Sequence, residues 1–395
     1  MKKRHLLFVI DSLVAAGAEK SLVTLLSVLD YTRYEVDLQL LSYGGEFEKY
    51  LPPQVRLLPP LPYYEFARQS AVRQLLSFDF RKIIARWRYS WAIRRGRTYH
   101  PDKARLFWEI ISPCLSPGSR TYDVAIAYAQ GVPTFYVVDK VSAGKKLAWV
   151  NVGYRLQGEN REFQERFYAM ADAIVPVSDA AKQIFSEVYP RFAGKMSVIW
   201  DMLDAGFIRR LAEEPLEQEL ESGCPALLTV ARLNKPQKGY DITLEACRIL
   251  RDRGVKFKWY AIGRGAYREE MERYIEEHRL QDVFVFLGTT PNPYPYIKGC
   301  TLYVQTSRHE GYGLSIAEAR ILNRPVVTTE FDAVYNQMVP GKNGLVVPQD
   351  PAAVADAVER LLSDKALYDA IVAYQRQEKK GNTEEVEKFY QLIDG

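Results

Sequence analysis

Short apolar segments alternate with amphipathic ones almost from end to end of this chain, and the alternation runs twice. Six segments in the first half predict strands: Leu6–Ile10, Val36–Leu41, Val124–Ala127, Leu147–Val150, Ile174–Val177 and Met196–Ile199. A second series does so after residue 205: Ala226–Val230, Phe257–Ile262, Val283–Leu287, Leu302–Gln305, Val326–Thr328 and Gly344–Val347. Continuous β-branched strands separated by helices are typical of parallel sheets covered on both faces. The pattern predicts an α/β protein with two doubly wound, Rossmann-like parallel-sheet domains facing a cleft.

The length of the chain agrees with two domains, because 395 residues are many for one hydrophobic core. Acidic sequence that contains Gly and Pro interrupts the alternation near residues 200–222. We expect an N-terminal domain over residues 1–203 and a C-terminal domain over residues 204–380. A C-terminal helix over residues 381–395 is expected to pack back on the N-terminal domain.

The composition excludes several classes of protein. With 47% hydrophobic and 26% charged residues, the chain is not disordered or of low complexity. The four cysteines are far apart and form no C-x-x-C pair, which excludes a Cys-rich zinc module or a disulfide scaffold. The four histidines are scattered, so no metal site is expected. Asp11 ends the first apolar run too early for a signal peptide, and a cytoplasmic protein is expected.

The charge is unevenly distributed. Residues 1–200 hold 28 Lys/Arg and 19 Asp/Glu (+9), and residues 201–395 hold 25 and 30 (−5). Between residues 60 and 110 the alternation breaks, and basic and aromatic residues dominate. On a helix, Arg81, Arg88 and Arg95 would share one face because they recur every seven residues. Ile84, Trp87 and Trp91 would line another face.

A basic face beside a tryptophan-bearing face suits an anionic membrane interface. An ordinary surface helix pair with tryptophans in the core is the alternative. Nucleic acid is not expected as a partner, since the segment has none of the motifs that read grooves or bases.

A glycine-rich turn after the strand Leu302–Gln305 is the segment most informative about chemistry. It runs from Ser307 through Glu310-Gly311-Tyr312-Gly313-Leu314 and opens a helix that contains Glu318. Glycines let backbone N–H groups approach a ligand closely, and a helix N-terminus favours phosphate. Glu318 lies about one turn into the helix, where its carboxylate can accept from ribose hydroxyls. It could instead offset the helix dipole.

Two cations follow the first strand of the second domain. Arg232 comes directly after Val230-Ala231, and Lys238-Gly239 precedes the next helix. An Arg fork and a Lys point charge on one loop suit a pyrophosphate. Other phosphate motifs are missing, because Gly263-Arg264-Gly265 lacks the third glycine of the dinucleotide fingerprint and no G-x-x-x-x-G-K-[ST] occurs.

With these features in this order, the sequence resembles the retaining glycosyltransferases of family 4, which have the GT-B fold. The resemblance covers nearly all of the second domain and is carried by these motifs: Arg232 with Lys238-Gly239, Ile262-Gly263-Arg264-Gly265, Phe286-Leu287-Gly288, Asn292-Pro293-Tyr294-Pro295-Tyr296, Glu310 to Leu314 with Glu318-Ala319, Arg324-Pro325-Val326-Val327, and Asn343 to Val347. In the first domain it is looser, at Ala16–Glu19 and Ala148–Val150.

The resemblance implies a nucleotide-sugar donor held mainly by the C-terminal domain. Arg232 and Lys238 would hold the diphosphate, Glu318 the ribose and Glu310 the transferred sugar. Further donor contacts are implied for Gly311, Tyr312, Gly313, Leu314, Gly263, Gly288 and Thr289, and for Gly17 from the other domain. Such enzymes use neither metal nor cofactor and retain the anomeric configuration.

The first domain departs from the family at three positions. Ala16 stands where many relatives have glycine, and Asp201 stands where asparagine is common. Asn151 replaces a histidine and can hydrogen-bond a sugar hydroxyl without shuttling a proton. Together with the three arginines of the basic segment, Arg81, Arg88 and Arg95, Asn151 is an expected acceptor-binding residue.

The resemblance therefore predicts a retaining, metal-independent glycosyltransferase of polysaccharide biosynthesis. Its donor would be a UDP-sugar, its acceptor a lipid-linked or cell-surface polysaccharide, and its location the inner face of the plasma membrane. A second hypothesis, favoured by Asn151 and Ala16, is a non-catalytic glycosyltransferase-like subunit that binds a partner or a glycan. A sugar-nucleotide epimerase is a third, although histidines are scarce near the site.

Overall fold

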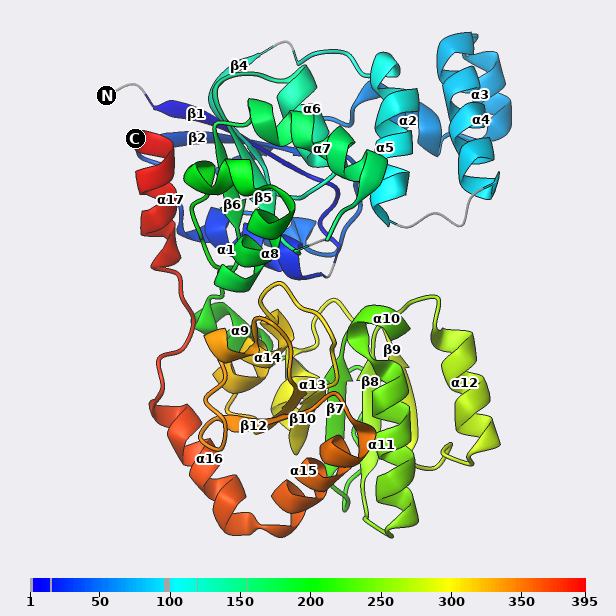
Figure 1. The fold of residues 1–395 in the computed structure, drawn as a ribbon, viewed down its shortest axis with the longest axis vertical. Helices are drawn as coiled ribbons and strands as arrows, with labels where there is room; N and C mark the ends of the chain where they lie inside the picture. The colour runs from blue at the N-terminus through cyan, green and yellow to red at the C-terminus, as the bar shows by residue number, and fades with distance from the viewer. Residues whose placement is uncertain (1–2, 15, 96–99, 119, 154) are drawn as a thin grey trace. The chain divides into compact units, whose positions relative to one another are not determined.

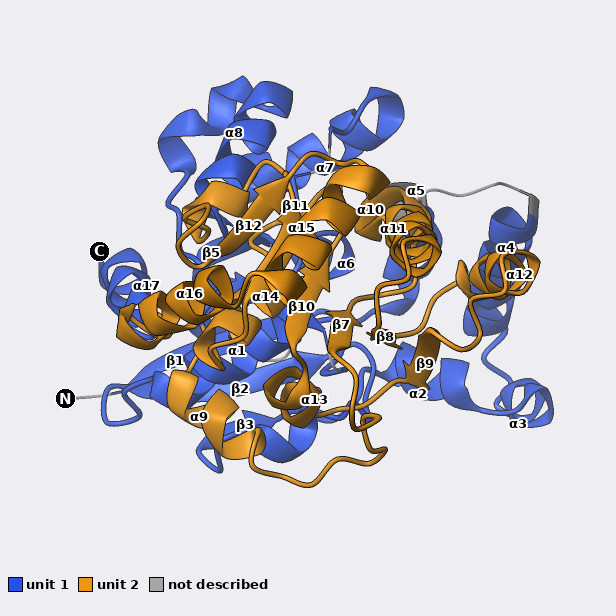
Figure 2. Cartoon of the chain, turned by 90° about the horizontal axis from the view of Figure 1, so that it is seen from below, with its two compact units in different colours: residues 1–202, 383–395 blue, residues 203–382 orange. Residues whose placement is uncertain are grey.

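The computed structural model describes residues 3–14, 16–95, 100–118, 120–153 and 155–395. The chain divides into two compact units, coloured separately in Figure 2. Unit 1 comprises Met1–Met202 and Thr383–Gly395, and unit 2 comprises Leu203–Asn382. In the described part of the chain each unit holds a six-stranded parallel sheet with helices around it (Figure 1). The two doubly wound domains predicted from the alternation are confirmed.

The sheet of unit 1 has the strand order β3-β2-β1-β4-β5-β6. Its strands are β1 (Arg4–Ile10), β2 (Tyr34–Leu40), β3 (Val55–Leu57), β4 (Thr121–Ala127), β5 (Ser142–Val150) and β6 (Ala173–Pro176). Its helices are α1 (Gly17–Val28), α2 (Pro62–Arg68), α3 (Ala71–Leu76), α4 (Phe80–Arg95), α5 (His100–Ile111), α6 (Val132–Lys140), α7 (Gly158–Met170), α8 (Asp179–Val188) and α17 (Glu385–Asp394).

Alternate residues of β1 contribute to two different cores. Leu6, Phe8 and Ile10 pack with α1 and α17 on one face of the sheet. Leu7 and Val9 pack with α2, α5, α6 and α7 on the other face. A strand with both faces buried requires the continuous apolar run that the sequence has here.

The C-terminal helix α17 belongs to unit 1. The ring centroid of Phe389 lies 5.9 Å from that of Phe8 and 6.2 Å from that of Trp149. The Arg4 guanidinium and the Lys145 ammonium donate to the carbonyl oxygens of Ile393 and Leu392, which lie in the last turn of α17. The favourable placement of cations at a helix C-terminus adds to the apolar contact.

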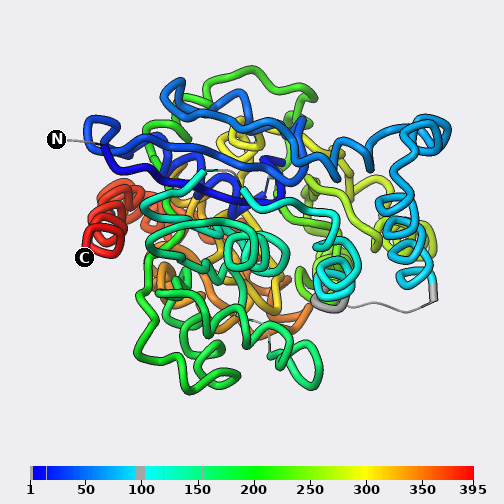
Figure 3. The backbone as a smooth tube through the Cα atoms, turned by 90° about the horizontal axis from the view of Figure 1, so that it is seen from above, coloured from blue at the N-terminus to red at the C-terminus, as the bar shows by residue number. Residues whose placement is uncertain are grey.

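Where the sequence alternation breaks, the described residues 62–95 and 100–111 form four helices, α2 to α5. Figure 3 shows α3 and α4 in blue and cyan, projecting at the edge of unit 1. The α4 helix packs on α5 through the Tyr89 and Phe107 rings, whose centroids are 5.3 Å apart.

Two segments of unit 1 differ from the sequence-based prediction. Met196–Ile199 is not a strand: Ser197 and Ile199 donate backbone N–H groups to β6, but only Met196 forms a bridge, with Ile174. The apolar character of the segment comes from its burial beside β6. Conversely, Val55–Leu57 forms β3 next to β2, although three residues are too few to show a periodicity.

The sheet of unit 2 has the order β12-β11-β10-β7-β8-β9. Its strands are β7 (Ala226–Val230), β8 (Lys258–Ile262), β9 (Phe284–Gly288), β10 (Leu302–Gln305), β11 (Val326–Thr329) and β12 (Gly344–Val347). Its helices are α9 (Ala205–Leu211), α10 (Lys235–Lys238), α11 (Tyr240–Asp252), α12 (Arg268–Glu277), α13 (Tyr294–Gly299), α14 (Leu314–Ile321), α15 (Pro351–Ser363) and α16 (Lys365–Gln377). Within the described ranges, no helix is long and apolar enough to cross a bilayer.

Candidate functional site

The strand order of unit 2 reverses between β7 and β10. From β7 the chain adds β8 and β9 on one side, and then β10, β11 and β12 on the other. In open parallel sheets, ligands bind at such a switch point, outside the carboxyl ends of the strands. The loop 231–239 follows β7 and the loop 306–313 follows β10, so both lie at this edge. They carry the two predicted cations and the predicted glycine turn.

A buried ion pair joins these two loops. Lys238 Nζ lies 2.6 Å from Glu310 Oε1, and the two side chains are only 13% and 10% exposed. The Glu310 Oε1 atom also accepts from Ser307 Oγ (2.6 Å) and Gln305 Nε2 (2.9 Å). Three donors thus converge on one carboxylate oxygen, and Oε2 accepts from none of these three. A partly buried carboxylate held by three donors in this way is fixed in orientation.

Gly239 allows the two loops to approach closely enough for this pair. It has φ +62°, and a Cβ there would lie 2.0 Å from the Thr306 carbonyl oxygen. Thr306 Oγ1 donates to the Gly239 carbonyl (2.9 Å) and lies 2.7 Å from Thr243 Oγ1. Gly239 is therefore required for the close approach of the two loops, and Lys238 before it supplies the positive charge.

Arg308 links the glycine turn to the first turn of α11. Its guanidinium binds both carboxylate oxygens of Asp241, at 2.9 and 2.7 Å. Burial raises the pKa of the Asp241 carboxyl, but the hydrogen bonds and charge of Arg308 outweigh it, and the net pKa is lowered. The pair fixes the position of the glycine turn relative to α11.

Arg232 extends from the end of β7 into solvent. Its guanidinium donates to Gln237 Oε1 at 3.2 Å, and Gln237 Nε2 donates to the His309 carbonyl at 3.4 Å. Arg232 is therefore connected to the glycine turn through Gln237. An exposed guanidinium held loosely by a neutral amide is free to bind an anion.

Gln337 fixes the glycine turn through two hydrogen bonds to its backbone. Gln337 Nε2 donates to the carbonyls of Tyr312 (2.6 Å) and Gly313 (3.0 Å). Gly313 has φ +88° and caps the N-terminus of α14, which begins at Leu314. A Cβ on Gly313 would meet Gln337 Nε2 at 2.9 Å. The predicted residues Gly311 to Leu314 thus form a rigid turn at a helix N-terminus.

Glu318 lies on α14 and is fully buried. The Tyr294 hydroxyl, from α13, donates to Glu318 Oε1 at 3.1 Å. The structure therefore brings Glu318 to Tyr294, and brings Glu310 to Lys238.

The remaining predicted glycines of unit 2 pack the loops after β7, β8 and β9 together. Gly263 donates its N–H to the Gly288 carbonyl (2.7 Å), and a Cβ on Gly263 would lie 1.9 Å from the Ala231 carbonyl oxygen. Gly288 has φ +78° with open space around its Cβ position, and Thr289 beside it is exposed. Gly263 is required by packing, whereas Gly288 and Thr289 lie at the surface.

In unit 1, Gly17 is the first residue of α1, and Ala16 before it has φ −135° and ψ 175°. This extended conformation is open to alanine, so replacing a glycine there strains nothing. Asn151 follows β5, and both polar atoms of its amide are buried without a hydrogen-bond partner among the described residues. A buried amide of this kind is able to bind a polar ligand.

Arg81 and Arg88 are exposed on α4, and Arg95 is its last residue. The continuous helix places the three positions on one face, as their spacing predicts. Ile84, Trp87 and Trp91 are exposed, so the reading in which these tryptophans belong to the core is wrong.

Several residues that hold the site were missed in the sequence. Gln305 is a polar residue at the end of the apolar strand β10, and this contrast is the signal that could have found it. Gln237 lies in the short helix α10 and Gln337 in a loop, and neither gave a signal. Ser307 was included in the glycine-rich turn, but without a role. Over the described residues, no group of three His, Cys, Asp or Glu side chains is arranged to hold a metal ion.

The fold is shared with solved glycosyltransferase structures. HepE from Anabaena, in complex with UDP and glucose, is similar over 99% of this chain and 100% of that chain, with a TM-score of 0.69 and 16% sequence identity. At this identity the likeness shows the fold alone. The chain therefore has the GT-B fold of two-domain glycosyltransferases.

Part of the second unit is similar to a known sequence family. Residues 224–364, which include Arg232, Lys238, Glu310 and Glu318, match the model of the glycosyl transferases group 1 family. Within this range, unit 2 is similar to the glycosyl transferases group 1 family.

Curated relatives match in part. The poly(ribitol-phosphate) alpha-N-acetylglucosaminyltransferase of Staphylococcus aureus is 30% identical over 40% of this chain. The alpha-D-kanosaminyltransferase of Streptomyces kanamyceticus is 32% identical over 36% of this chain. The matches span 33% and 38% of the length of those two proteins.

Proposed function

We propose that the protein is a retaining glycosyltransferase that transfers a sugar from a UDP-sugar to a lipid-linked or cell-surface polysaccharide acceptor, without a metal ion or cofactor. The observation that carries the proposal is the buried pair of Lys238 and Glu310 at the switch point of unit 2, with Arg232 beside it. This arrangement offers cations to a diphosphate and a fixed carboxylate to a sugar.

Arg232 and Lys238 are suited to the leaving group. When the bond between the anomeric carbon and the diphosphate oxygen breaks, negative charge accumulates on the diphosphate. Permanent cations at that position stabilise the charge in the transition state. The N-terminus of α14 adds its dipole to this field.

Glu310 is suited to bind the sugar of the donor, and Glu318 is suited to bind its ribose. Oε1 of Glu310 is occupied by its three donors, so we assign Oε2 to a hydroxyl of the transferred sugar. Glu318 is assigned to the ribose hydroxyls, with Tyr294 holding its Oε1 atom. Gly263, Gly288 and Thr289 are assigned to the base, and Gly17 to the donor from unit 1.

In the proposed step the acceptor hydroxyl attacks the anomeric carbon on the face that the diphosphate leaves. The acceptor oxygen forms the new glycosidic bond, and its proton passes to the departing phosphate oxygen. The configuration at the anomeric carbon is thereby retained, and no side chain needs to act as a general base. An asparagine at position 151 is compatible with this route, since the Asn151 amide orients a hydroxyl and moves no proton.

The acceptor class rests on charge and on the activity for which one relative is named. That relative acts on poly(ribitol-phosphate), an anionic polymer. Unit 1 of this chain carries the basic segment with Arg81, Arg88 and Arg95, which suits an acceptor with an anionic, lipid-bearing end.

The experiment is a UDP-release assay with UDP-glucose, UDP-galactose and UDP-N-acetylglucosamine, in the presence of EDTA and with octyl glycosides as acceptors. We expect release with one donor and an α-linked product by proton NMR. Arg232→Ala should remove the activity, whereas Arg273→Ala, an exposed arginine on α12, should not. Donor binding without transfer would instead support a non-catalytic subunit, and conversion of the donor without acceptor an epimerase.

A further inference from the structure

Large apolar side chains gather on the surface of α3, α4 and the turn between them. Their exposure ranges from 47% at Trp91 to 72% at Phe78. The exposed residues of this α3–α4 apolar face are Val72, Leu75, Leu76, Phe78, Phe80, Ile84, Trp87 and Trp91. Soluble proteins rarely expose so many large apolar side chains together unless the patch binds something.

The packing of both helices directs these residues outward. On α4, Phe80, Ile84, Trp87 and Trp91 follow at spacings of four, three and four, which is one side of a helix. The opposite side packs inward through Tyr89. The helix therefore has two apolar sides, and only one of them is used by the fold.

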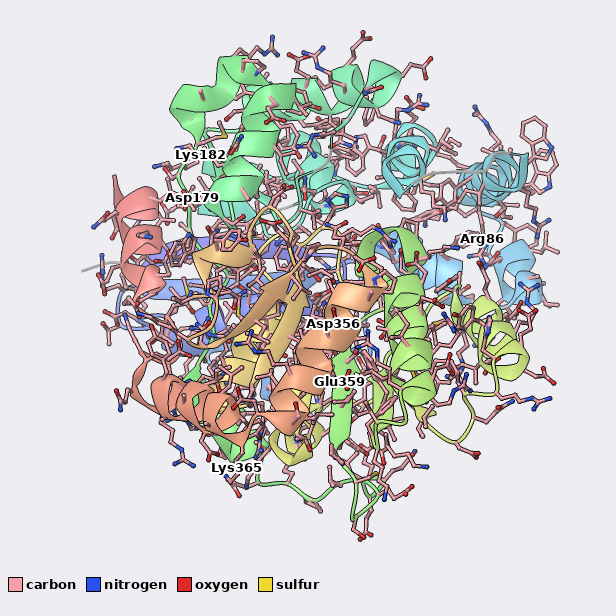
Figure 4. The ribbon with its side chains drawn as sticks, turned by 60° about the horizontal axis from the view of Figure 1, so that its bottom comes forward. Arg86, Asp179, Lys182, Asp356, Glu359 and Lys365 are labelled. Atoms are coloured by element: carbon pink, nitrogen blue, oxygen red, sulfur yellow. The ribbon has the colours of Figure 1, made fainter. Side chains whose placement is uncertain are left out.

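Hydrogen bonds fix α3 and α4 on α2. The buried Gln74 amide donates to the carbonyls of Gln69 (2.7 Å) and Phe66 (3.2 Å), close to the C-terminus of α2. Arg86, labelled in Figure 4, donates to the Ala67 carbonyl. The apolar face is therefore part of a held structure.

Phe78 and Phe80 form the tip between the two helices. Phe78 has φ +52°, a left-handed conformation that a bulky side chain rarely adopts, and it is the most exposed of the apolar residues. The centroids of its ring and the Phe80 ring are 6.5 Å apart. The backbone thus holds two phenyl rings together at the outermost turn.

The apolar face is bordered by unneutralised positive charge. From Arg68 to Arg95 the sequence holds eight Lys or Arg residues and one acidic residue, Asp79. Asp79 is paired with Lys82 at 2.8 Å. Of the described side chains, Arg73, Arg88 and Arg94 are exposed and have no acidic partner, and the exposed Arg81 interacts with Asp79 through charge without a hydrogen bond. On α4, Arg81 and Arg88 flank one side of the apolar stripe, and Arg94 flanks the other.

We propose that the α3–α4 apolar face docks on an anionic lipid bilayer, with Phe78, Phe80, Trp87 and Trp91 entering the headgroup region. Tryptophan and phenylalanine prefer the interface between headgroups and acyl chains, and bordering arginines bind anionic headgroups. A second copy of the chain is a poorer occupant, because a two-fold contact through this face would bring its arginines against one another.

Docking on the bilayer does not depend on the proposed function. Only the transfer of a sugar by the docked protein rests on it. Docking would bring the site to an acceptor whose lipid end lies in the membrane. Docking itself is measured without donor or acceptor, and donor binding is measured without a membrane. Failure of one is therefore distinguishable from failure of the other.

The experiment is flotation of the full chain with vesicles of phosphatidylcholine, with and without phosphatidylglycerol. We expect binding only with phosphatidylglycerol. Each basic residue near an anionic surface contributes about 1 kcal/mol, so loss of three of them alone weakens partitioning by more than about a hundredfold. Reversing Arg81, Arg88 and Arg94 to glutamate should weaken it further. The matched control reverses Lys256, Arg273 and Lys342, exposed basic residues of unit 2, and should leave binding intact.

Tryptophan emission tests insertion. Trp108, Trp149 and Trp259 are buried and Trp200 is half-buried, whereas Trp87 and Trp91 are exposed. A blue shift on vesicle binding is therefore assigned to the exposed pair only if it disappears when both are replaced. Phe replacement of both should remove the shift and preserve flotation. Equal binding by the arginine-reversal variant and its control would overturn the proposal. So would dimerisation in solution that is lost in the Trp87→Ala, Trp91→Ala variant.

Discussion

Lys238 Nζ and Glu310 Oε1 are 2.6 Å apart, although 72 positions separate the two residues in the chain. One lies after β7 and the other after β10, and both side chains are largely buried. In this state the carboxylate of Glu310 competes with any phosphate for the ammonium of Lys238. The two proposed roles, diphosphate binding by Lys238 and sugar binding by Glu310, can therefore be separated by experiment.

Changing Glu310 to glutamine should affect catalysis and nucleotide binding in opposite directions. Loss of the carboxylate frees Lys238 for the diphosphate and removes a negative charge, so the Kd for UDP should fall several-fold. Transfer should fall by about a hundredfold or more, because a group that stabilises the transition state is lost. Calorimetric titration with UDP and the UDP-release assay measure the two effects. Weaker UDP binding in the Glu310→Gln variant would contradict the competition.

Gln305 should act as a positioning residue for Glu310. Gln305→Leu removes one donor from the carboxylate and leaves the Tyr303 hydroxyl without its Gln305 acceptor. We expect kcat to fall about tenfold, UDP affinity to stay unchanged and stability to fall by about 1–2 kcal/mol. Single-turnover kinetics and urea unfolding check these values. An unchanged kcat would mean that the orientation of Glu310 does not depend on Gln305.

Two glycines form a matched pair for a test of loop packing. Gly263→Ala places a Cβ 1.9 Å from the Ala231 carbonyl oxygen, and the loops after β7 and β8 must separate. Gly288→Ala meets nothing within 4 Å and adds only the strain of a positive φ, about 1–2 kcal/mol. Thermal unfolding should therefore show a clearly larger loss for Gly263→Ala. Similar losses for both variants would argue against the close approach of the two loops.

Asp201 should make unit 1 less stable as the pH rises. Burial raises its pKa to about 7, against which a hydrogen bond with Ser21 acts weakly. The unfolded chain keeps the ordinary value of 3.8, so it loses this proton first, and stability falls between about pH 4 and pH 7. Asp201→Asn removes this dependence and should add up to about 4 kcal/mol at about pH 8, with little change at about pH 4.

Melting temperatures across that range test the prediction for Asp201. Asp332→Asn, at an exposed aspartate, is the control and should follow the wild-type curve. A constant difference between wild type and Asp201→Asn at every pH would exclude titration of this carboxyl as the cause.

Much of the fold could be predicted from the sequence because its signals are local. Strands such as Leu6–Ile10 and Leu302–Gln305 are continuous apolar runs, and the structure has β1 and β10 there. Met196–Ile199 has the same character but lacks strand pairing beyond one bridge. An apolar segment indicates burial, but its own sequence does not show whether a neighbouring strand pairs with it.

The sequence predicts which residues form the candidate site, but it does not predict which of them contact one another. The order of motifs placed Lys238 and Glu310 at strand ends, yet only the strand order β10-β7 makes these ends neighbours. Gln305 was missed because one polar residue at a strand end has many explanations. Trp87 and Trp91 could not be assigned to core or surface, because α4 has apolar residues on two opposite sides.

We propose that unit 2 binds a nucleoside diphosphate through Arg232 and Lys238. The most direct measurement is calorimetric titration of the purified chain with UDP, GDP, ADP and NAD in EDTA. We predict binding of UDP alone among these, lost in Arg232→Ala and retained in Arg273→Ala. Binding of NAD, or UDP binding that both variants retain, would contradict the account.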